Sequence, residues 1–260
     1  MIVRRISEHV KAHNWFAVAI DLFVVILGVF IGMQVQDWNA ARQTSVRAGE
    51  FSARLVSDLR VEAWGYEYLV EYNKDVLANA ERAIKALTGD QPLPDEQFVV
   101  AVYRATQYKY NERRRATYDE LVSTGAIGLI ADAKLRQTAI SVFTNPLFDV
   151  ISQEGKDSGL RKVFRETAPA DIQHALLKKC GDSYVEPGNF AGIAGSLDYE
   201  CSLGVSAASI EAAALALRTH PALLSALKLR FADVETAITD LETNNTTVLS
   251  NLREIAQAGS

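Results

Sequence analysis

An unbroken run of hydrophobic residues lies close to the start of the chain. Residues 15–35 contain no Lys, Arg, Glu or Pro, and the segment from Leu22 to Met33 is apolar apart from its glycines. As a helix rising 1.5 Å per residue, the segment from Trp15 to Trp38 is about 35 Å long. Its two indole rings can therefore lie at the two interfaces of a hydrocarbon core about 30 Å thick. The pattern predicts a transmembrane helix between the two tryptophans.

A cleaved signal peptide and a buried core helix are the alternatives to a retained membrane anchor. A signal peptide has a shorter apolar region followed by a small-residue cleavage site, and residues 32–38 contain no Ala-x-Ala pattern. A buried core helix is disfavoured by the N-terminal position of the run and by its flanking tryptophans. We therefore expect a short cytoplasmic N-terminus at residues 1–14, a transmembrane helix at residues 15–38 and a helical extracytoplasmic domain at residues 39–260.

The basic residues on the two sides of the span give only a weak preference for its orientation. Arg4, Arg5 and Lys11 precede the span, whereas Arg42 and Arg47 follow it closely. Cytoplasmic flanks carry the excess of Lys and Arg, so the small difference favours a cytoplasmic N-terminus. In that orientation the rest of the chain lies outside the cytoplasm, where a disulfide can persist.

Four small or polar residues of the span fall on one face of the predicted helix. At 100° per residue, Ala17, Asp21, Gly28 and Gly32 lie within about 60° of one another. The two glycines form a G-x-x-x-G step that lets a second helix approach closely, and a carboxyl group in lipid is costly unless it finds a donor. The face therefore predicts a helix–helix interface. The alternative is that glycine is simply frequent in membrane helices and that Asp21 reaches water near the headgroups.

Beyond the span, apolar positions recur at alternating steps of three and four in two long segments. No proline occurs before Pro92, so one helix can run from the bilayer to Thr88. Its seam consists of Leu55, Leu59, Glu62, Tyr66, Leu69, Asn73, Val76, Ala80, Ala83 and Leu87. The segment after Pro221 has a second seam, made of Leu224, Leu227, Phe231, Val234, Ile238, Leu241, Asn245, Val248, Leu252 and Ile255. Heptad seams of this kind are typical of coiled-coil-like packing.

The two seams are expected to meet. Asn73 and Asn245 occupy equivalent positions, where a buried amide needs a partner and penalises the wrong register. We therefore expect the C-terminal helix to pack antiparallel on residues 55–88 within one chain, with the two asparagines in the same or neighbouring layers as a register-setting polar core. The alternative is an intermolecular coiled coil made by the same seams.

The middle of the chain has shorter helical patterns and no sustained period-two alternation. Capping, glycine and proline signals predict helices at about residues 96–110, 118–123, 132–144, 146–167, 169–180 and 206–219. Together with the two long segments, these helices define an all-α fold. It consists of one N-terminal transmembrane helix followed by a long-helix bundle with coiled-coil-like packing.

A Gly-rich acidic loop is predicted at residues 181–200, which contain four glycines and four carboxylates but no Lys or Arg. Cys180 and Cys201 flank this loop and form a candidate disulfide, which would stabilise the fold by about 3 kcal/mol on the chain-entropy estimate. The alternative is two free buried thiols, because spacing alone does not show that the sulfurs meet. The loop carboxylates match no calcium-loop pattern.

Residue types that carry catalysis or metal binding are few. The chain has two cysteines and four histidines, and it contains no hydrolase elbow, Walker loop, H-E-x-x-H motif or C-x-x-C pair. His174 and the cysteines lack a fourth zinc ligand. Lys and Arg total 27 against 32 Asp and Glu, a net charge of −5, which disfavours a nucleic-acid partner. We expect a non-enzymatic protein with no metal and no cofactor.

Two parts of the chain carry a resemblance to a known family. Residues 15–21, 28–35 and 37–39 (WFAVAID, GVFIGMQV and DWN) resemble an uncharacterised family of bacterial single-pass membrane proteins, a domain-of-unknown-function family. Residues 118–125 and 127–130 are similar to its second recurring motif. The resemblance implies an inner-membrane location in a Gram-negative bacterium and a mostly helical soluble part. It implies no activity and supplies no catalytic residues.

The expected function is that of a membrane-anchored interaction or scaffold protein of the bacterial inner membrane, with most of the chain in the periplasm. Its expected partners are the lipid bilayer and either further copies in a homo-oligomer or another membrane protein, docked through the Asp21 and glycine face. The alternative is a periplasmic ligand sensor that signals through a partner protein, because residues 1–14 are too short to form a signalling domain. The sequence does not identify a small-molecule ligand.

Overall fold

The longest element is a single helix, α2, which runs from Trp15 to Thr88 (74 residues). The computed structural model describes residues 15–110 and 112–258, so the segment expected in the cytoplasm lies outside the described residues. The helix confirms the prediction made from the absence of proline. It ends where Gly89 has a φ of +84°, a left-handed conformation that glycine adopts without steric cost.

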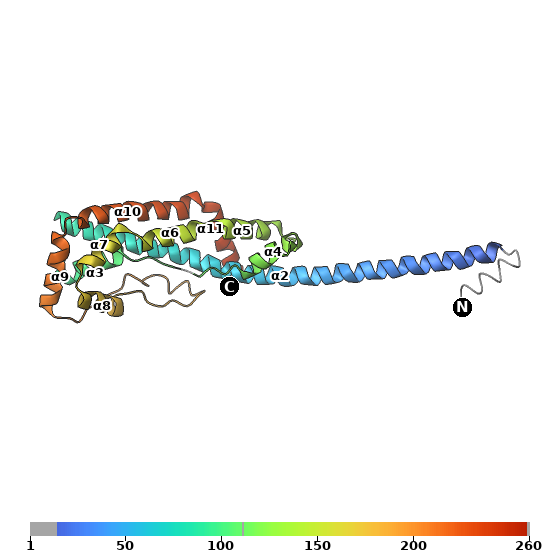
Figure 1. Cartoon of the computed structure of the whole chain (residues 1–260), viewed down its shortest axis with the longest axis horizontal. Helices are drawn as coiled ribbons and strands as arrows, with labels where there is room; N and C mark the ends of the chain where they lie inside the picture. The colour runs from blue at the N-terminus through green and yellow to red at the C-terminus, as the bar shows by residue number, and fades with distance from the viewer. Residues whose placement is uncertain (1–14, 111, 259–260) are drawn as a thin grey trace.

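Helix α2 has two unlike parts (Figure 1). As far as residue 50 it projects alone from the rest of the molecule, and none of its described side chains is buried. From Phe51 onward it runs through the middle of a helical bundle, which buries many of its side chains and covers Leu55, Leu59 and Val76 completely. We call residues 15–50 the bare part and residues 51–88 the wrapped part.

The bundle is built from short helices around the wrapped part. They are α3 (Asp95–Ala105), α4 (Ala116–Ser123), η1 (Ala126–Leu129), α5 (Ala133–Thr144), α6 (Leu147–Lys156), α7 (Gly159–Thr167), α8 (Ala170–Lys179), α9 (Ala207–Thr219), α10 (Leu223–Thr239), η2 (Asp240–Asn244) and α11 (Thr246–Gln257). No strand occurs among the described residues. The all-α class and the long-helix bundle are therefore confirmed, while residues 181–200 form the expected irregular loop.

The helix predicted over residues 146–167 is split into α6 and α7, with Ser158 capping the second by accepting a hydrogen bond from the backbone N–H of Arg161. Gly155 lies within α6 and does not cause the break between the two helices. Its role is to allow close packing. A Cβ at this position would lie 2.6 Å from Cβ of Tyr108, so only glycine lets α6 approach the segment after α3 this closely.

The C-terminal segment packs on the wrapped part of α2 within one chain, and it runs antiparallel to it. Tyr66 donates a hydrogen bond to the carbonyl of Leu241 at 2.9 Å, and Arg60 lies against the carbonyl of Ile255. The segment is not one continuous heptad helix, however. The π-helical turn η2 separates α10 from α11, so coiled-coil packing along the whole seam is not confirmed.

On the buried face of α10, every second position of the predicted seam is replaced by the residue that precedes it in the sequence. Three predicted seam positions are buried as expected: Leu227, Val234 and Leu241. The positions between them differ, because the structure buries Leu223, Arg230 and Ala237 where the seam predicted Leu224, Phe231 and Ile238. An arginine therefore lies on the buried face, which a pattern of apolar residues does not reveal.

Arg230 is buried because it donates hydrogen bonds to backbone carbonyls at the C-terminal end of α3. Its guanidinium donates to the carbonyls of Ala105 at 3.3 Å and Gln107 at 2.9 Å. The last carbonyls of a helix have no partner within the helix, and a cation near them also complements the helix dipole. Burial lowers the pKa of Arg230 to about 10, which still leaves the side chain charged at neutral pH.

Candidate functional site

The face predicted as a helix–helix interface lies on the bare part of α2. A Cβ at Gly28 or Gly32 would meet no atom within 4 Å, so both glycines are open to a partner. Asp21 is half-buried, and its Oδ2 has no hydrogen-bond partner within the described chain. The side chain of Ala17 lies outside the described residues. Within the described chain, nothing occupies the predicted interface at the two glycines.

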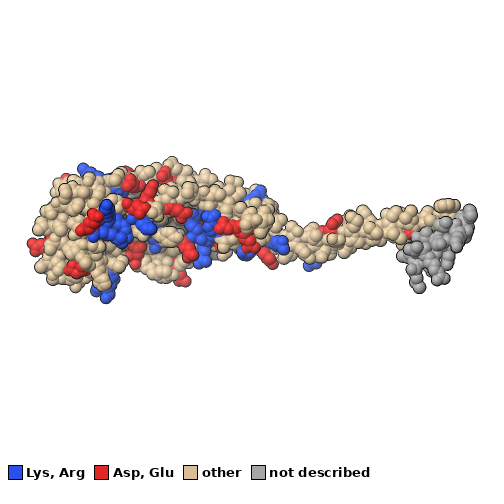
Figure 2. Space-filling view, viewed as in Figure 1, with Lys and Arg blue, Asp and Glu red and all other residues tan. Residues whose placement is uncertain are grey.

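The bare part is long and apolar enough to cross a membrane, and none of its apolar window is buried within the molecule. Trp15 and Trp38, predicted to lie at the two membrane interfaces, are 71% and 66% exposed. In the space-filling view this rod carries few charged groups, whereas the visible face of the bundle carries many of both signs (Figure 2). These observations support a single helix that could cross a membrane.

The two cysteines are brought together as predicted. The sulfurs of Cys180 and Cys201 are 2.15 Å apart, with a Cα–Cα distance of 5.5 Å. Cys180 ends α8 and is fully buried, while Cys201 is half-buried. The pair closes the loop of residues 181–200 at its base.

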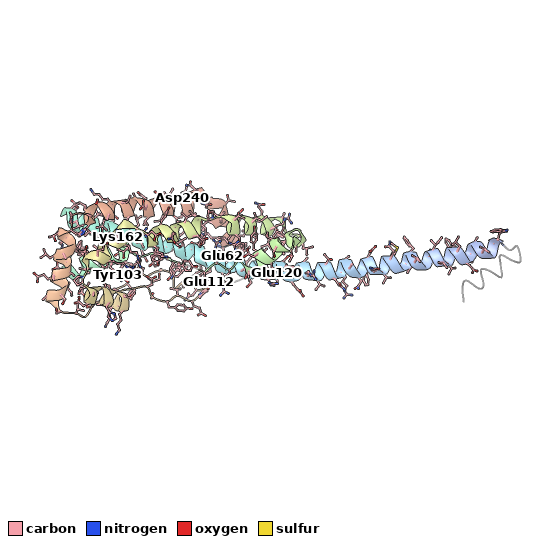
Figure 3. The ribbon with its side chains drawn as sticks, viewed as in Figure 1. Glu62, Tyr103, Glu112, Glu120, Lys162 and Asp240 are labelled. Atoms are coloured by element: carbon pink, nitrogen blue, oxygen red, sulfur yellow. A yellow bond between two sulfur atoms is a disulfide. The ribbon has the colours of Figure 1, made fainter. Side chains whose placement is uncertain are left out.

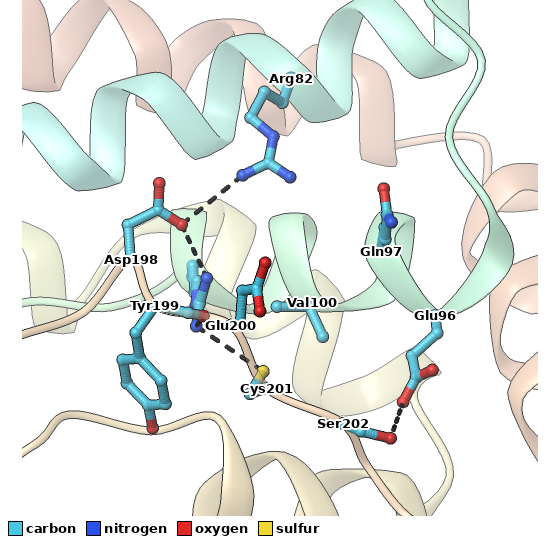
Figure 4. A pocket seen from close by; sticks show the side chains of 10 residues that line it. Arg82, Glu96, Gln97, Val100, Asp198, Tyr199, Glu200, Cys201 and Ser202 are labelled. Atoms are coloured by element: carbon cyan, nitrogen blue, oxygen red, sulfur yellow. Dashed lines mark hydrogen bonds and ion pairs between the residues drawn. The ribbon is translucent and has the colours of Figure 1, made fainter. Parts of the chain in front are cut away.

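Charged side chains fasten the C-terminal end of this loop, next to Cys201, to the bundle (Figure 4). Arg104 of α3 is only 3% exposed and donates to Oδ1 of Asp198 at 2.7 Å. The same guanidinium donates to the carbonyl of Tyr199 and lies over its ring, 5.0 Å from the centroid. Arg82 of α2 reaches the same Asp198 oxygen at 3.6 Å. One loop carboxylate thus holds two helices.

A second carboxylate lies close to this network. Asp75 of α2 is half-buried, and its pKa is raised to about 6, first by burial and then by the negative charge of Asp198. The loop is also held by Asp182, which accepts a 2.8 Å hydrogen bond from the hydroxyl of Tyr72. Because Tyr72 is buried and faces this carboxylate, its pKa is raised well above the usual value. The raised pKa values mean that the hydroxyl of Tyr72 and the carboxyl group of Asp75 favour their protonated forms.

A polar cavity of about 700 Å³ opens beside the disulfide, between the loop and helices α2 and α3. Its lining includes the side chains of Arg82, Glu96 and Glu200. Glu96 already accepts a hydrogen bond from Ser202 at 3.0 Å and another from the backbone N–H of Leu203. The cavity offers charges of both signs, together with the hydroxyl of Ser202. It is suited to binding a small polar molecule.

The two asparagines predicted to set the register are not paired with each other. Asn73 is buried and donates to the carbonyl of Leu69 in its own helix at 2.7 Å. Asn245 lies at the junction after η2, where it donates to the carbonyl of Asp240 and accepts from Asn145 at 2.8 Å. Asn245 lies between η2 and α11, and the expectation that the two asparagines lie in the same or neighbouring layers stays a prediction.

Neither Arg104 nor Asp198 was predicted from the sequence as part of a site. Arg104 follows the apolar run Phe98 to Tyr103, so a lone arginine at the end of a buried helix was the available signal. Asp198 is 94 residues away, and the sequence placed it only in the Gly-rich acidic loop. Among the residues that the structure describes, no group of three or more His, Cys, Asp and Glu residues is placed to hold a metal ion.

Comparison of the chain with protein-family models, with curated proteins and with solved structures found no match. The resemblance to the family of single-pass membrane proteins therefore stays an expectation, and functional conclusions must come from the geometry of this chain.

Proposed function

We propose that the chain is a non-enzymatic, membrane-anchored interaction or scaffold protein of a bacterial inner membrane, with its helical bundle in the periplasm. The observation that carries this proposal is the bare part of α2. An apolar helix of this length with no protein covering it needs either lipid or another apolar surface around it.

The continuity of α2 supports a scaffold role. The helix that would cross the bilayer is the same helix that forms the centre of the bundle, with no hinge between its two parts. Residues 39–50 would hold the bundle about 18 Å beyond the end of the span. The bundle is thereby displayed at a set distance from the membrane, as a docking platform requires.

The periplasmic location is supported by the cysteine pair. Disulfides persist in oxidising compartments and are rare in the cytoplasm, and Cys180 and Cys201 are at bonding distance. The lipid bilayer is then one partner, and further copies of the chain or another membrane protein are the partners for the open face at Gly28 and Gly32.

The second candidate function is a periplasmic ligand sensor that relays through a partner protein. The polar cavity beside the disulfide favours it, because Arg82 of α2 lines this cavity and α2 continues into the span. A ligand that displaced Asp198 from Arg82 would act directly on the helix that crosses the membrane.

Self-association of the full-length protein in detergent micelles tests the scaffold role. Gly28→Ile with Gly32→Ile fills the open face and should reduce the associated fraction or the recovery of a membrane partner. Ala19→Ile is the matched control, since it enlarges a side chain on the opposite face of the same helix. Unchanged association and unchanged partner recovery in the double variant would contradict docking through this face.

Labelling of introduced cysteines in intact cells tests the orientation. Leu229 is exposed on α10, so Leu229→Cys should react with a membrane-impermeant maleimide once the outer membrane is permeable. Ser7→Cys, on the other side of the span, should react only after the inner membrane is broken. The reverse pattern would place the bundle in the cytoplasm and contradict the proposal.

A further inference from the structure

A second cavity, distinct from the one beside the disulfide, lies between α3, α7 and α8. Its volume is about 370 Å³, within the range of about 300–1,000 Å³ that is typical of small-molecule sites. Arg161 and Arg165 of α7 and His174 of α8 line it, and no Asp or Glu does. Its apolar wall includes Phe164 and Leu177. The cavity therefore combines concentrated positive groups with an apolar surface.

The two arginines that line the cavity have no carboxylate partner in the described part of the chain. They stand four residues apart on α7, on the same helix face, where like charges repel. Arg161 donates to the carbonyl of Thr106 at 3.2 Å and lies over the ring of Tyr108. Neither guanidinium forms an ion pair with a carboxylate in the described part of the chain. Burial and the charge of Arg165 lower the pKa of Arg161.

The position of Arg161 in its helix adds to this cost. It lies in the first turn of α7, where the partial positive charge of the helix end disfavours a cation. Three effects therefore disfavour the positive charge of Arg161: repulsion by Arg165, partial burial and the helix dipole. An anion bound between the guanidiniums would relieve all three.

We infer that this cavity is a binding site for a small organic anion, a carboxylate or phosphate group carried on an apolar body. The planar guanidiniums of Arg161 and Arg165 suit the oxygens of such a group. Phe164 and Leu177 would cover its apolar part. The inference goes beyond the proposed anchor and scaffold role and does not depend on it.

The place of the cavity in the molecule favours a soluble anion over a lipid headgroup. Tyr103, which also lines the cavity, and Lys162 of α7 lie at the end of the bundle remote from the bare part of α2, whereas Glu120 lies near the bare part (Figure 3). A bilayer around the bare part would therefore be separated from the site by most of the length of the bundle.

Calorimetric titration of the full-length protein in detergent micelles tests the inference, with phenyl phosphate, benzoate, inorganic phosphate and uncharged phenol as probes. We expect phenyl phosphate and benzoate to bind, inorganic phosphate to bind more weakly and phenol not to bind. Arg165→Gln should weaken phenyl phosphate binding at least tenfold. Lys162→Gln removes the same charge from an exposed position of α7 that does not line the cavity, and it should change the affinity less than twofold.

A stability readout separates a binding role from a structural one. Without ligand, Arg165→Gln should melt at or above the temperature of the unchanged protein, because it removes repulsion and no ion pair. Absence of binding by all anions at millimolar concentration, equal weakening by the two variants, or equal binding of phenol would overturn the inference. Repeating the titration in nanodiscs tests the source of the anion. Loss of phenyl phosphate binding in phosphatidylglycerol but not in phosphatidylcholine would assign the site to lipid and overturn the soluble ligand.

Discussion

The two parts of α2 belong to one helix, but their apolar side chains are covered in different ways. Leu59 in the wrapped part is fully buried by the bundle, whereas Leu27 in the bare part is 40% exposed and touches no folded domain. The wrapped part carries polar groups in its buried face, and Glu62, Asn73 and Asn79 each have a hydrogen-bond partner there. Residues 15–35 of the bare part carry a single charged side chain, Asp21, and the apolar window there is not buried by any described part of the chain. The difference shows which part the chain covers itself and which part it leaves to lipid or another protein.

Breaking the buried ion pair of the wrapped part should lower the free energy of unfolding more than the other substitutions considered below. Glu62 is 3% exposed and accepts hydrogen bonds from Nε of Arg113 and from the backbone N–H of Arg114, both at 2.6 Å. Glu62→Ala leaves a largely buried guanidinium without its carboxylate and should lower the free energy of unfolding by about 3–5 kcal/mol. Chemical denaturation in detergent measures it. Asp21→Ala is the control in the bare part, and a loss in both variants would break the comparison.

Truncation of matched leucines should give the next largest effect. Leu59→Ala creates a cavity in the core and should lower the free energy of unfolding of the bundle by about 2–5 kcal/mol. Leu27→Ala removes the same atoms from the bare part, so the same denaturation experiment should show no change in bundle stability. Equal losses at the two positions would mean that the bare part also packs on the bundle.

Removal of the disulfide should loosen the loop that covers the wrapped part. The loop contacts α2 through Trp64, which donates to the carbonyl of Asn189 at 3.2 Å. Cys180→Ala with Cys201→Ala should lower the free energy of unfolding by about 2–4 kcal/mol. A reductant should destabilise the unchanged protein but not this double variant. Indifference of the unchanged protein to reductant would show that the bond contributes nothing.

The smallest effect should be the pH dependence caused by Asp75. Its pKa is raised to about 6 in the folded protein, from 3.8. The folded state therefore binds more protons in this interval, and the stabilisation present at low pH is lost as the pH rises through about 6. Asp75 is only partly buried and faces Asp198, Glu71 and Arg104, so solvent screening limits the effect.

Thermal unfolding of Asp75→Asn at two pH values measures this effect. At pH 7.5 the variant should be more stable than the unchanged protein by about 1 kcal/mol, and near pH 4 the two should agree. Asp37→Asn, an exposed residue of the bare part, is the control and should show no pH-dependent difference. A variant that is less stable at pH 7.5 would mean that the carboxylate is needed in its charged form.

The sequence was a good guide to α2 because its signals are local. The absence of proline before Pro92 predicted the length of the helix, and the seam from Leu55 to Ala83 is buried throughout. Even the two polar residues in that seam, Glu62 and Asn73, are buried as predicted.

The rest of the bundle depends on contacts between distant residues, which periodicity does not report. Arg230 is buried because α3 ends beside it, and Arg104 is buried because Asp198 comes to it from the loop. The pattern of apolar positions also gives no sign that Arg113 pairs with a glutamate 51 residues earlier. In each case the arginine is buried because it contacts a polar partner that lies far away in the sequence.

Hydrogen–deuterium exchange along α2, measured on the full-length protein in lipid nanodiscs, tests the central claim most directly. The account predicts three zones: slow exchange at residues 15–38 inside the bilayer, fast exchange at residues 39–50, and slow exchange at residues 51–88 inside the bundle. Added denaturant should release the third zone with the unfolding of the bundle and leave the first protected. Exchange at residues 15–38 as fast as at residues 39–50 would contradict a membrane-spanning helix.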